Sequence, residues 1–347
     1  MAHSDYPYAS QLRAELGLRN RLHARKRLHV ESFGNPPVIV YAPEYPTDGH
    51  ASAGNPLNVE RHGNFFDAAY TAIAARQQWM RRFDKVHAQG SRALPKPVMD
   101  PARRWRELDS SMSSDALLMN VFCTPGVVES ATVRNMLGVE DSDPPEFGWR
   151  ARVPLKNGRF DRTEVDMRLG GLLVESKLTE SDFQTCKAAV AEGYRDFDEV
   201  FERDLLPRIA LPVRRRREAV EFPEDYSQEA ESFIDLTAVS PIFPGPAPDV
   251  EVEQGYASYQ LIRNVLGAFA HGCCFCVIHD QRRPDLREAW FQVMAAVKPV
   301  AARVSLKVLT WQELAAVLPE QLQRFLDLKY GIVAPGQVPS PVRTDPD

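Results

Sequence analysis

The amino-acid sequence predicts an α/β sandwich in which a mixed β-sheet, made of an antiparallel meander plus parallel strands, is flanked by helices. Two patterns carry this prediction. Over 149–177, strand-like segments follow one another across tight turns, which is typical of antiparallel strands. Over 275–309, strand and helix patterns alternate, which favours parallel pairing. With 347 residues, of which 44% are hydrophobic and 26% charged, the chain suits a globular fold of one large or two ordinary domains.

The segments ahead of the meander are predicted to be mainly helical. Residues 1–31 have the pattern of a basic amphipathic helix, 38–41 that of a short strand, and 49–58 that of a loop rich in Gly, Ser and Asn. Apolar side chains recur at helical spacing over 64–86, which predicts one helix packed on the core.

Two short helices are expected directly before the meander. Ser113 or Ser114 is a suitable N-cap for a helix over 115–123, because a serine hydroxyl accepts a hydrogen bond from an N–H of the first turn. The second helix is predicted over 129–137.

The meander itself is predicted from its turns. A strand over 149–154 leads through Asn157-Gly158 into the strand that carries Asp166, and Gly170-Gly171 joins that strand to the next. Both glycines of the second turn can take positive φ without a Cβ penalty, as a two-residue hairpin turn requires.

The second half of the chain alternates between helix and strand, with a proline-rich loop over 241–248. The predicted elements are helices over 182–194 and 254–271, a strand over 275–278, a helix over 285–297, a strand over 304–309 and helical structure over 311–330.

The hairpin around Gly170-Gly171 carries the most information about function. With this turn, Asp166 falls opposite Glu175, and Glu164 falls opposite Lys177. Side chains alternate across a strand, so these four share one face. The other face then carries Val165, Met167, Val174 and Ser176. Carboxylates that face one another repel, and a bound divalent cation would offset this repulsion. Oxygen ligands suit magnesium or manganese better than zinc.

An acid followed on the next strand by Glu-x-Lys resembles the core of the PD-(D/E)XK nuclease superfamily, here Asp166 and then Glu175-Ser-Lys177. Further stretches are similar, in the same order, to a bacterial family of restriction endonucleases within that superfamily, over roughly residues 60–331. These stretches are 113–120, 175–180 with Phe183, 259–264, 279–284, 309–314 and 329–331. The chain departs from the pattern in lacking a Pro before the acid and in having Ser176 where Ile or Val is expected.

This resemblance implies a restriction-endonuclease-like fold. It also implies the activity of a metal-dependent DNA endonuclease in restriction, defence or repair. The expected cofactor is Mg²⁺, and the expected partner is DNA.

Phosphodiester hydrolysis gives the residues of the hairpin their expected roles. A metal held by Asp166 and Glu175 would activate the attacking water and neutralise charge at the phosphate. Glu164 is a further candidate ligand, or a partner for Lys177. Lys177 is expected to position the water or stabilise the phosphate; burial and the metal lower its pKa whereas the carboxylates raise it, so a base role stays open. The resemblance adds Gln260, on the helix after Glu-x-Lys, as a site residue.

The sequence also allows other interpretations of the Glu-x-Lys pair, of the activity and of the substrate. A Glu and a Lys two positions apart also occur as a solvated ion pair on an exposed sheet. A catalytically silent nucleic-acid-binding or scaffold protein would keep the fold without the activity, and RNA is the alternative substrate. Arg263 and Glu129 are weaker candidates, because an exposed helix face accounts for the first and a first-turn acid for the second.

DNA binding is expected to depend on local basic clusters, because the formal net charge of the chain is −5. Clusters occur at 19–29, at 76–85 along one predicted helix, at 103–106 around Trp105, and at 214–217. The alternative for each cluster is a solvated helix face or a linker.

Further features of the sequence predict where the protein is located and how the chain is organised. The chain lacks an apolar run near the ~18 residues of a membrane span and an apolar signal-peptide core, which predicts a cytoplasmic protein without a membrane partner. The five cysteines lack the spacing of a disulfide framework or of a metal site.

The chain is predicted to have three parts: a helical and loop extension over 1–60, a nuclease-like domain over 61–331 and a flexible tail over 332–347. A homodimer would suit the cutting of two antiparallel strands.

Overall fold

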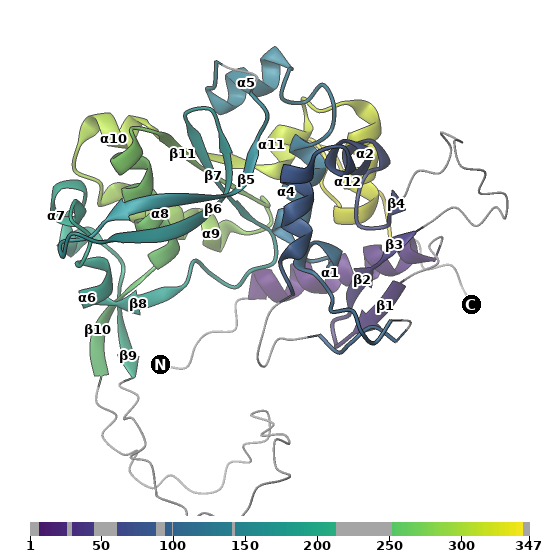
Figure 1. Ribbon diagram of the computed structural model, residues 1–347, viewed down its shortest axis with the longest axis horizontal. Helices are drawn as coiled ribbons and strands as arrows, with labels where there is room; N and C mark the ends of the chain where they lie inside the picture. Colours follow the sequence, from purple (N-terminus) through teal and green to yellow (C-terminus); the bar gives the residue numbers. More distant parts are fainter. Residues whose placement is uncertain are drawn as a thin grey trace, which may run out of the picture.

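A five-stranded mixed sheet forms the centre of the computed structural model, which describes residues 7–25, 30–44, 61–87, 94–98, 100–140, 143–212 and 252–342 (Figure 1). Its strands are β5 (Glu146–Pro154), β6 (Phe160–Leu169), β7 (Leu172–Lys177), β11 (Cys274–His279) and β12 (Leu306–Thr310). They lie in the order β12-β11-β7-β6-β5. β5, β6 and β7 pair antiparallel, whereas β11 pairs parallel with both β7 and β12. The predicted fold class, a meander plus parallel strands between helices, is confirmed.

The central hairpin has the predicted turn and register. Gly170 has a φ of +55°, and Leu169 pairs with Leu172 and Met167 with Val174. All six residues of β7 are buried, including Glu175 at 0% and Lys177 at 6% exposure. The Glu-x-Lys segment is therefore not a solvated pair on an exposed sheet.

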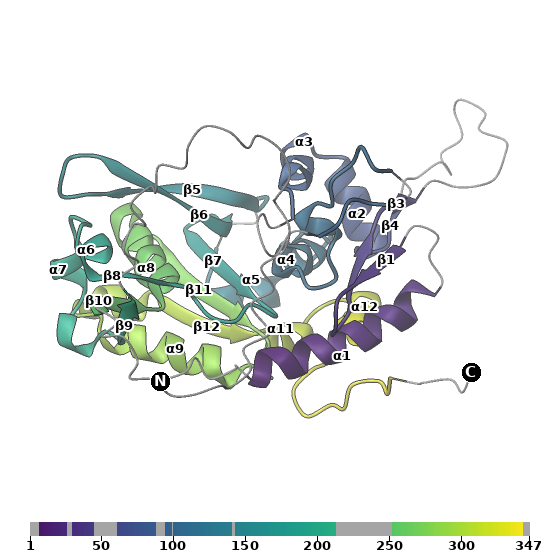
Figure 2. The same ribbon diagram turned by 90° about the horizontal axis from the view of Figure 1, so that it is seen from below.

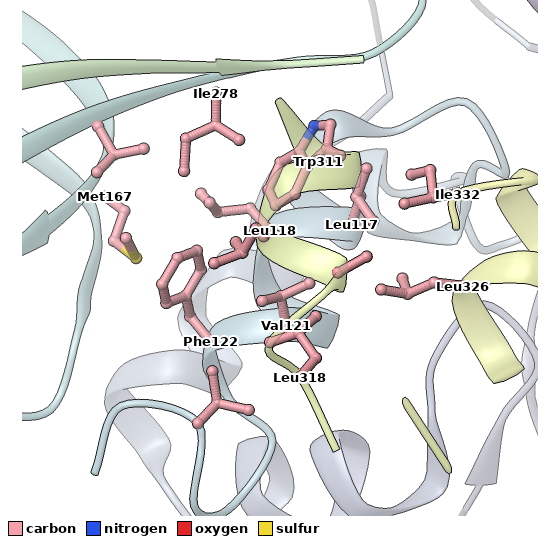
Figure 3. Close-up of a cluster of buried hydrophobic side chains, with 14 of the residues drawn as sticks. Leu117, Leu118, Val121, Phe122, Met167, Ile278, Trp311, Leu318, Leu326 and Ile332 are labelled. Atoms are coloured by element: carbon pink, nitrogen blue, oxygen red, sulfur yellow. The ribbon is translucent and has the colours of Figure 1, made fainter. Parts of the chain in front are cut away.

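One hydrophobic cluster, here called the α4-side core, covers one face of the sheet. It takes Met167, Val174 and Ile278 from the strands. Figure 3 shows Met167 and Ile278 facing Leu118, Phe122 and Trp311 across this interior. Its helices are α1 (Pro7–Ala24), α4 (Ser114–Phe122), α5 (Ala131–Leu137), α11 (Trp311–Ala315) and α12 (Glu320–Tyr330).

A second cluster, here called the α8-side core, covers the opposite face, and Figure 2 shows the strands between α8 and α4. It takes Val165, Leu173 and Val277 from the sheet. Its helices are α6 (Ala188–Ala191), α7 (Phe197–Val200), α8 (Tyr259–His271), α9 (Pro284–Ala295) and the short α10 (Val300–Val304).

The helices on the α4 side begin where the sequence provides a cap. Ser113 is the N-cap of α4, and its hydroxyl accepts a 3.1 Å hydrogen bond from the N–H of Ala116. Ser130 caps α5, so this helix begins two residues after the predicted start at 129. Of the two predicted N-cap candidates, Ser113 is confirmed and Ser114 is the first residue of the helix, which packs beside β7.

A smaller antiparallel sheet corrects two of the predicted helices. Its strands are β8 (Thr185–Lys187), β9 (Arg208–Pro212) and β10 (Val252–Ala257), in the order β8-β10-β9. A single helix over 182–194 and a helix starting at 254 are therefore wrong. These segments gain their stability by pairing with strands far away in the sequence, which local apolar spacing does not report.

The predicted single helix over 64–86 is also wrong. The chain is extended at Arg76, with φ −124° and ψ 105°, and this residue separates two helices. The break lets Trp79 and Phe83 fold back onto Phe65 and Ile73 in one buried cluster. The elements of this part are α2 (Asp67–Ala74), α3 (Gln77–Met80) and the 3-10 turns η1 (Arg81–Asp84) and η3 (Glu107–Asp109).

The remaining elements are short. They are β1 (Val30–Phe33), β2 (Val38–Tyr41), β3 (Pro43–Glu44), β4 (Arg61–His62) and η4 (Arg203–Leu205). The predicted strand over 38–41 is confirmed, whereas the loops predicted over 49–58 and 241–248 lie outside the described residues. Within the described ranges, no helix is both long and apolar enough to cross a bilayer.

Candidate active site

β6 separates from β7 at Asp166. Backbone pairing between these strands stops at Met167 and Val174, and the ladder of β5 with β6 skips the position where Gly148 faces Asp166. At this point the carboxylate of Asp166 reaches across instead and accepts a 2.7 Å hydrogen bond from the N–H of Ser176. The half-buried carboxylate is thus held in the opening between the two strands.

The side chains of β6 change face at the same point. Val165 packs in the α8-side core and Met167 in the α4-side core, although residues two apart on a regular strand share a face. Glu164 consequently points toward α4, where its Oε1 lies 2.7 Å from Nη1 of Arg82. The prediction that Glu164 faces Lys177 on one shared surface is therefore wrong.

Arg82 forms ion pairs with two acids, Asp115 on α4 and Glu164 on β6. Its Nη2 lies 2.5 Å from Oδ2 of Asp115 on α4, and its Nη1 contacts Glu164 on β6. Burial alone lowers the pKa of Arg82, but the charges of Asp115 and Glu164 outweigh it and hold the pKa above its ordinary value. Gly148, with φ +63°, makes room for this guanidinium, because a Cβ at that position would overlap it.

Gly148→Ala is therefore expected to lower the free energy of unfolding by about 2–3 kcal/mol, since it combines a strained positive φ with displacement of Arg82. Gly158→Ala is the matched control: its φ is +78°, and a Cβ there meets nothing within 4 Å. The control should lose only the cost of strain, about 1 kcal/mol. Urea unfolding measures both, and equal losses would contradict the role of Gly148 in seating Arg82.

Glu175 is hydrogen-bonded through both carboxylate oxygens. Its Oε1 accepts from Lys177 Nζ at 2.8 Å and from Gln260 Nε2 at 2.5 Å. Its Oε2 accepts from Asn264 Nδ2 at 2.8 Å, and Lys177 Nζ also donates to Gln260 Oε1 at 2.9 Å. Residues 260 and 264 are one turn apart on α8, so one helix face presents two amides to the buried carboxylate.

The charges of this cluster are unevenly compensated. Burial alone lowers the pKa of Lys177, but the charges of Glu175, Glu180 and Asp166 raise it above the ordinary value, so the side chain is an ammonium. Burial raises the pKa of Asp166 well above its ordinary range, and the charges of Glu175 and Asp115 raise it further. The nearby positive charge of Lys177 lowers the pKa of Asp166 but does not offset these effects.

The structure brings together Asp166, Glu175, Lys177 and Gln260 from the predicted set and sets Glu164 apart with Arg82. The sequence did not single out Asp115 and Asn264. Asp115 follows the two candidate N-cap serines, but only the packing of α4 on β7 carries it to the acids. Asn264 lies four residues after Gln260, and that helical spacing is the signal that could have found it.

A groove of about 680 Å³ gives access to the cluster. Its lining includes Lys177 and Gln260, together with Lys85, Ser114 and Thr179. The groove therefore reaches the cluster at Lys177 and Gln260, whereas Asp166 and the fully buried Glu175 are not among its lining residues.

The oxygen donors of this cluster fit a hard divalent cation. In the described ranges, no group of three or more His, Cys, Asp or Glu side chains is arranged to hold a metal ion by itself. Mg²⁺ does not need such a group, because proteins commonly bind it through one or two carboxylates, with water and substrate phosphate completing the shell. The raised pKa of Asp166 beside Glu175 is the electrostatic condition that a cation would relieve.

The weaker candidates lie elsewhere. The guanidinium of Arg263 lies over the ring of Tyr259 at 5.3 Å, and Glu129 is exposed in the turn before α5.

The basic clusters differ in their placement. Arg19, from the first basic cluster, is buried and donates to Glu15 and to the backbone of Asp327, which makes it a structural contact between α1 and α12. Residues 214–217 lie outside the described residues.

Comparison with known protein families finds a match over most of the chain. Residues 38–331 match the model of the family described as "Restriction Endonuclease associating with ARP". No curated protein and no solved structure matches the chain.

Proposed function

The chain belongs to this restriction endonuclease family, and on that premise we propose that it is a metal-dependent DNA endonuclease whose active site is the cluster around Asp166, Glu175 and Lys177. The observation that carries the proposal is the convergence of two carboxylates and a buried ammonium where β6 and β7 separate. The family description also names an association with ARP, and we include such a partner in the proposal.

Asp166 and Glu175 are the proposed ligands of Mg²⁺, with Mn²⁺ as a substitute. When bound, the cation would supply a water that is nucleophilic at neutral pH and would offset charge on the phosphate. Glu164 is not part of this ligand pair, because Arg82 holds its carboxylate on the other side of β6.

Lys177 is the proposed phosphate contact. Lys177 lines the groove, and its ammonium is fixed by Glu175 and Gln260, so it is already oriented to bind a phosphate oxygen or the attacking water. Gln260 and Asn264 are positioning residues, since each donates to one oxygen of Glu175 and so fixes the plane of that carboxylate.

The test of this function is incubation of the purified protein with supercoiled plasmid, linear duplex, single-stranded DNA and RNA, in magnesium, manganese or chelator. The proposal expects nicked and linear products from duplex DNA with either metal and intact DNA in chelator. Cleavage that continues in chelator, or cleavage of RNA alone, would contradict it.

A catalytically silent DNA-binding protein is the second candidate. It is favoured by the hydrogen bonds that already occupy both oxygens of Glu175. Under this alternative the same substrates are retarded in gels but never cut, with any metal.

Magnesium is expected to stabilise the protein against heat. A ligand that binds only the folded state at a concentration one hundred times its Kd adds about 2.7 kcal/mol to the free energy of unfolding. The melting temperature of the wild type should therefore rise with added magnesium, and that of Asp166→Asn should not. An equal rise in both proteins would place the cation elsewhere.

A further inference from the structure

The β5–β6 hairpin has one covered face and one open face. Ala151 and Val153 of β5 and Val165 of β6 are buried in the α8-side core, so the alternate residues point away from α8. We call this second surface the outer face; its residues are Arg150, Arg152, Phe160, Arg162 and Glu164. Figure 2 shows the hairpin as a long ribbon that leaves the rest of the sheet.

The outer face carries more positive than negative charge. Arg152 and Arg162 are directly opposite each other across the two strands, and both are exposed. Like charges at such a pair destabilise a sheet, so the pairing is unfavourable for the isolated protein. An anion bound between them would remove this cost.

The remaining groups of the face do not neutralise these arginines. The Arg150 side chain is 71% exposed and lies 3.7 Å from Glu164, whose other oxygen is held by Arg82. The guanidinium of Arg152 stacks over the ring of Phe160 at 4.4 Å, and Phe160 is 48% exposed. An exposed aromatic ring beside exposed guanidinium groups suits a phosphate-bearing partner better than solvent.

The outer face and the candidate active site share strand β6, although Glu175 and Lys177 contact Gln260 and Asn264 on the α8 side of the sheet. Arg162 precedes Asp166 by four residues on β6, a distance of about 13 Å along an extended strand. Between them, Glu164 contacts Arg82, and Arg82 contacts Asp115 beside the acids. The separation along β6 is thus short enough for one DNA duplex to contact both the Asp166 site and the hairpin.

We propose that the outer face of the β5–β6 hairpin binds the phosphate backbone of duplex DNA beside the phosphate that is cut. The proposal rests on the proposed function, because it takes the DNA to be held at the same time by the Asp166 site. Arg152 and Arg162 each contact one phosphate of the backbone, and Arg150, two residues from Arg152 and so about 7 Å away, reaches a neighbouring phosphate.

The test is the binding of a labelled DNA duplex in calcium, followed by anisotropy across a salt series. The double variant Arg152→Ala/Arg162→Ala should weaken binding by about tenfold or more and flatten the slope of log affinity against log salt by about 1.8, since each lost phosphate contact contributes about 0.9. Its melting temperature should be unchanged or raised, because the like-charge pair is removed. The matched control Arg208→Ala/Arg324→Ala removes two exposed arginines on β9 and α12 and should leave both affinity and slope unchanged.

A milder variant keeps the proposal testable if the double variant folds poorly. Arg162→Gln should flatten the slope by about 0.9, and Arg152→Lys/Arg162→Lys should restore most of the wild-type slope. If the wild type binds duplex DNA and all these variants match it, the hairpin serves another partner and the inference is overturned, while the proposed function stands. If the wild type binds no duplex, the proposed function and the inference both fail.

Discussion

Asp166→Asn is expected to abolish DNA cleavage and leave the protein at least as stable as the wild type in chelator. Asparagine can still accept the hydrogen bond from the N–H of Ser176, so the opening between β6 and β7 keeps its shape. The variant removes a charge that burial, Glu175 and Asp115 make costly, since all three raise the pKa of Asp166. Cleavage is measured with duplex DNA in magnesium, and stability by thermal melting in chelator.

The sign of the stability change follows from this pKa. An aspartate with a raised pKa in the folded state binds protons more tightly than in the unfolded state, so its cost appears as pH rises above about 3.9, the ordinary value. The gain in melting temperature of Asp166→Asn over the wild type should therefore be larger at neutral than at acidic pH. Normal cleavage by this variant would exclude Asp166 as a metal ligand.

Lys177→Met is expected to lower turnover by about a hundredfold or more, because it removes a fixed positive charge next to the developing negative charge. In contrast to Asp166→Asn, it should also destabilise the protein in chelator, by about 3 kcal/mol, since it leaves Glu175 buried without its cationic partner. DNA binding in calcium should persist, and magnesium should still raise the melting temperature.

The control for Lys177 is Gln260→Leu, which removes a hydrogen-bond partner of both Lys177 and Glu175 but no charge. It should slow cleavage less than Lys177→Met does. Unchanged turnover in Lys177→Met, or loss of the magnesium effect on melting, would contradict the assignment of Lys177 to the phosphate rather than to the metal.

The meander and its hairpin could be predicted from the sequence because their signals are local. Asn157-Gly158 and Gly170-Gly171 specify tight turns, and the register of β6 with β7 follows from the second turn. The parallel pairing of β11 follows from strand and helix alternation for the same reason.

The shape of the site could not be predicted, because it depends on contacts between distant segments. Glu164 does not lie on the predicted face, because it binds Arg82, which is 82 residues earlier in the chain. The guanidinium of Arg82 occupies space that a side chain at Gly148 would fill. Asp115 approaches Asp166 only through the packing of α4 on the sheet. The helix predicted from 254 failed in the same way, since β10 is a strand by virtue of its pairing with β8 and β9.

The proposed active site requires Asp166 and Glu175 to share a divalent cation. This shared ligation can be measured in crystals of the protein soaked in manganese, at a wavelength where manganese scatters anomalously. One strong anomalous peak is expected at ligand distance from a carboxylate oxygen of Asp166 and from one of Glu175, with Lys177 close by but not bound to the metal. A peak at other residues, or none in crystals whose protein cuts DNA in manganese, would contradict it.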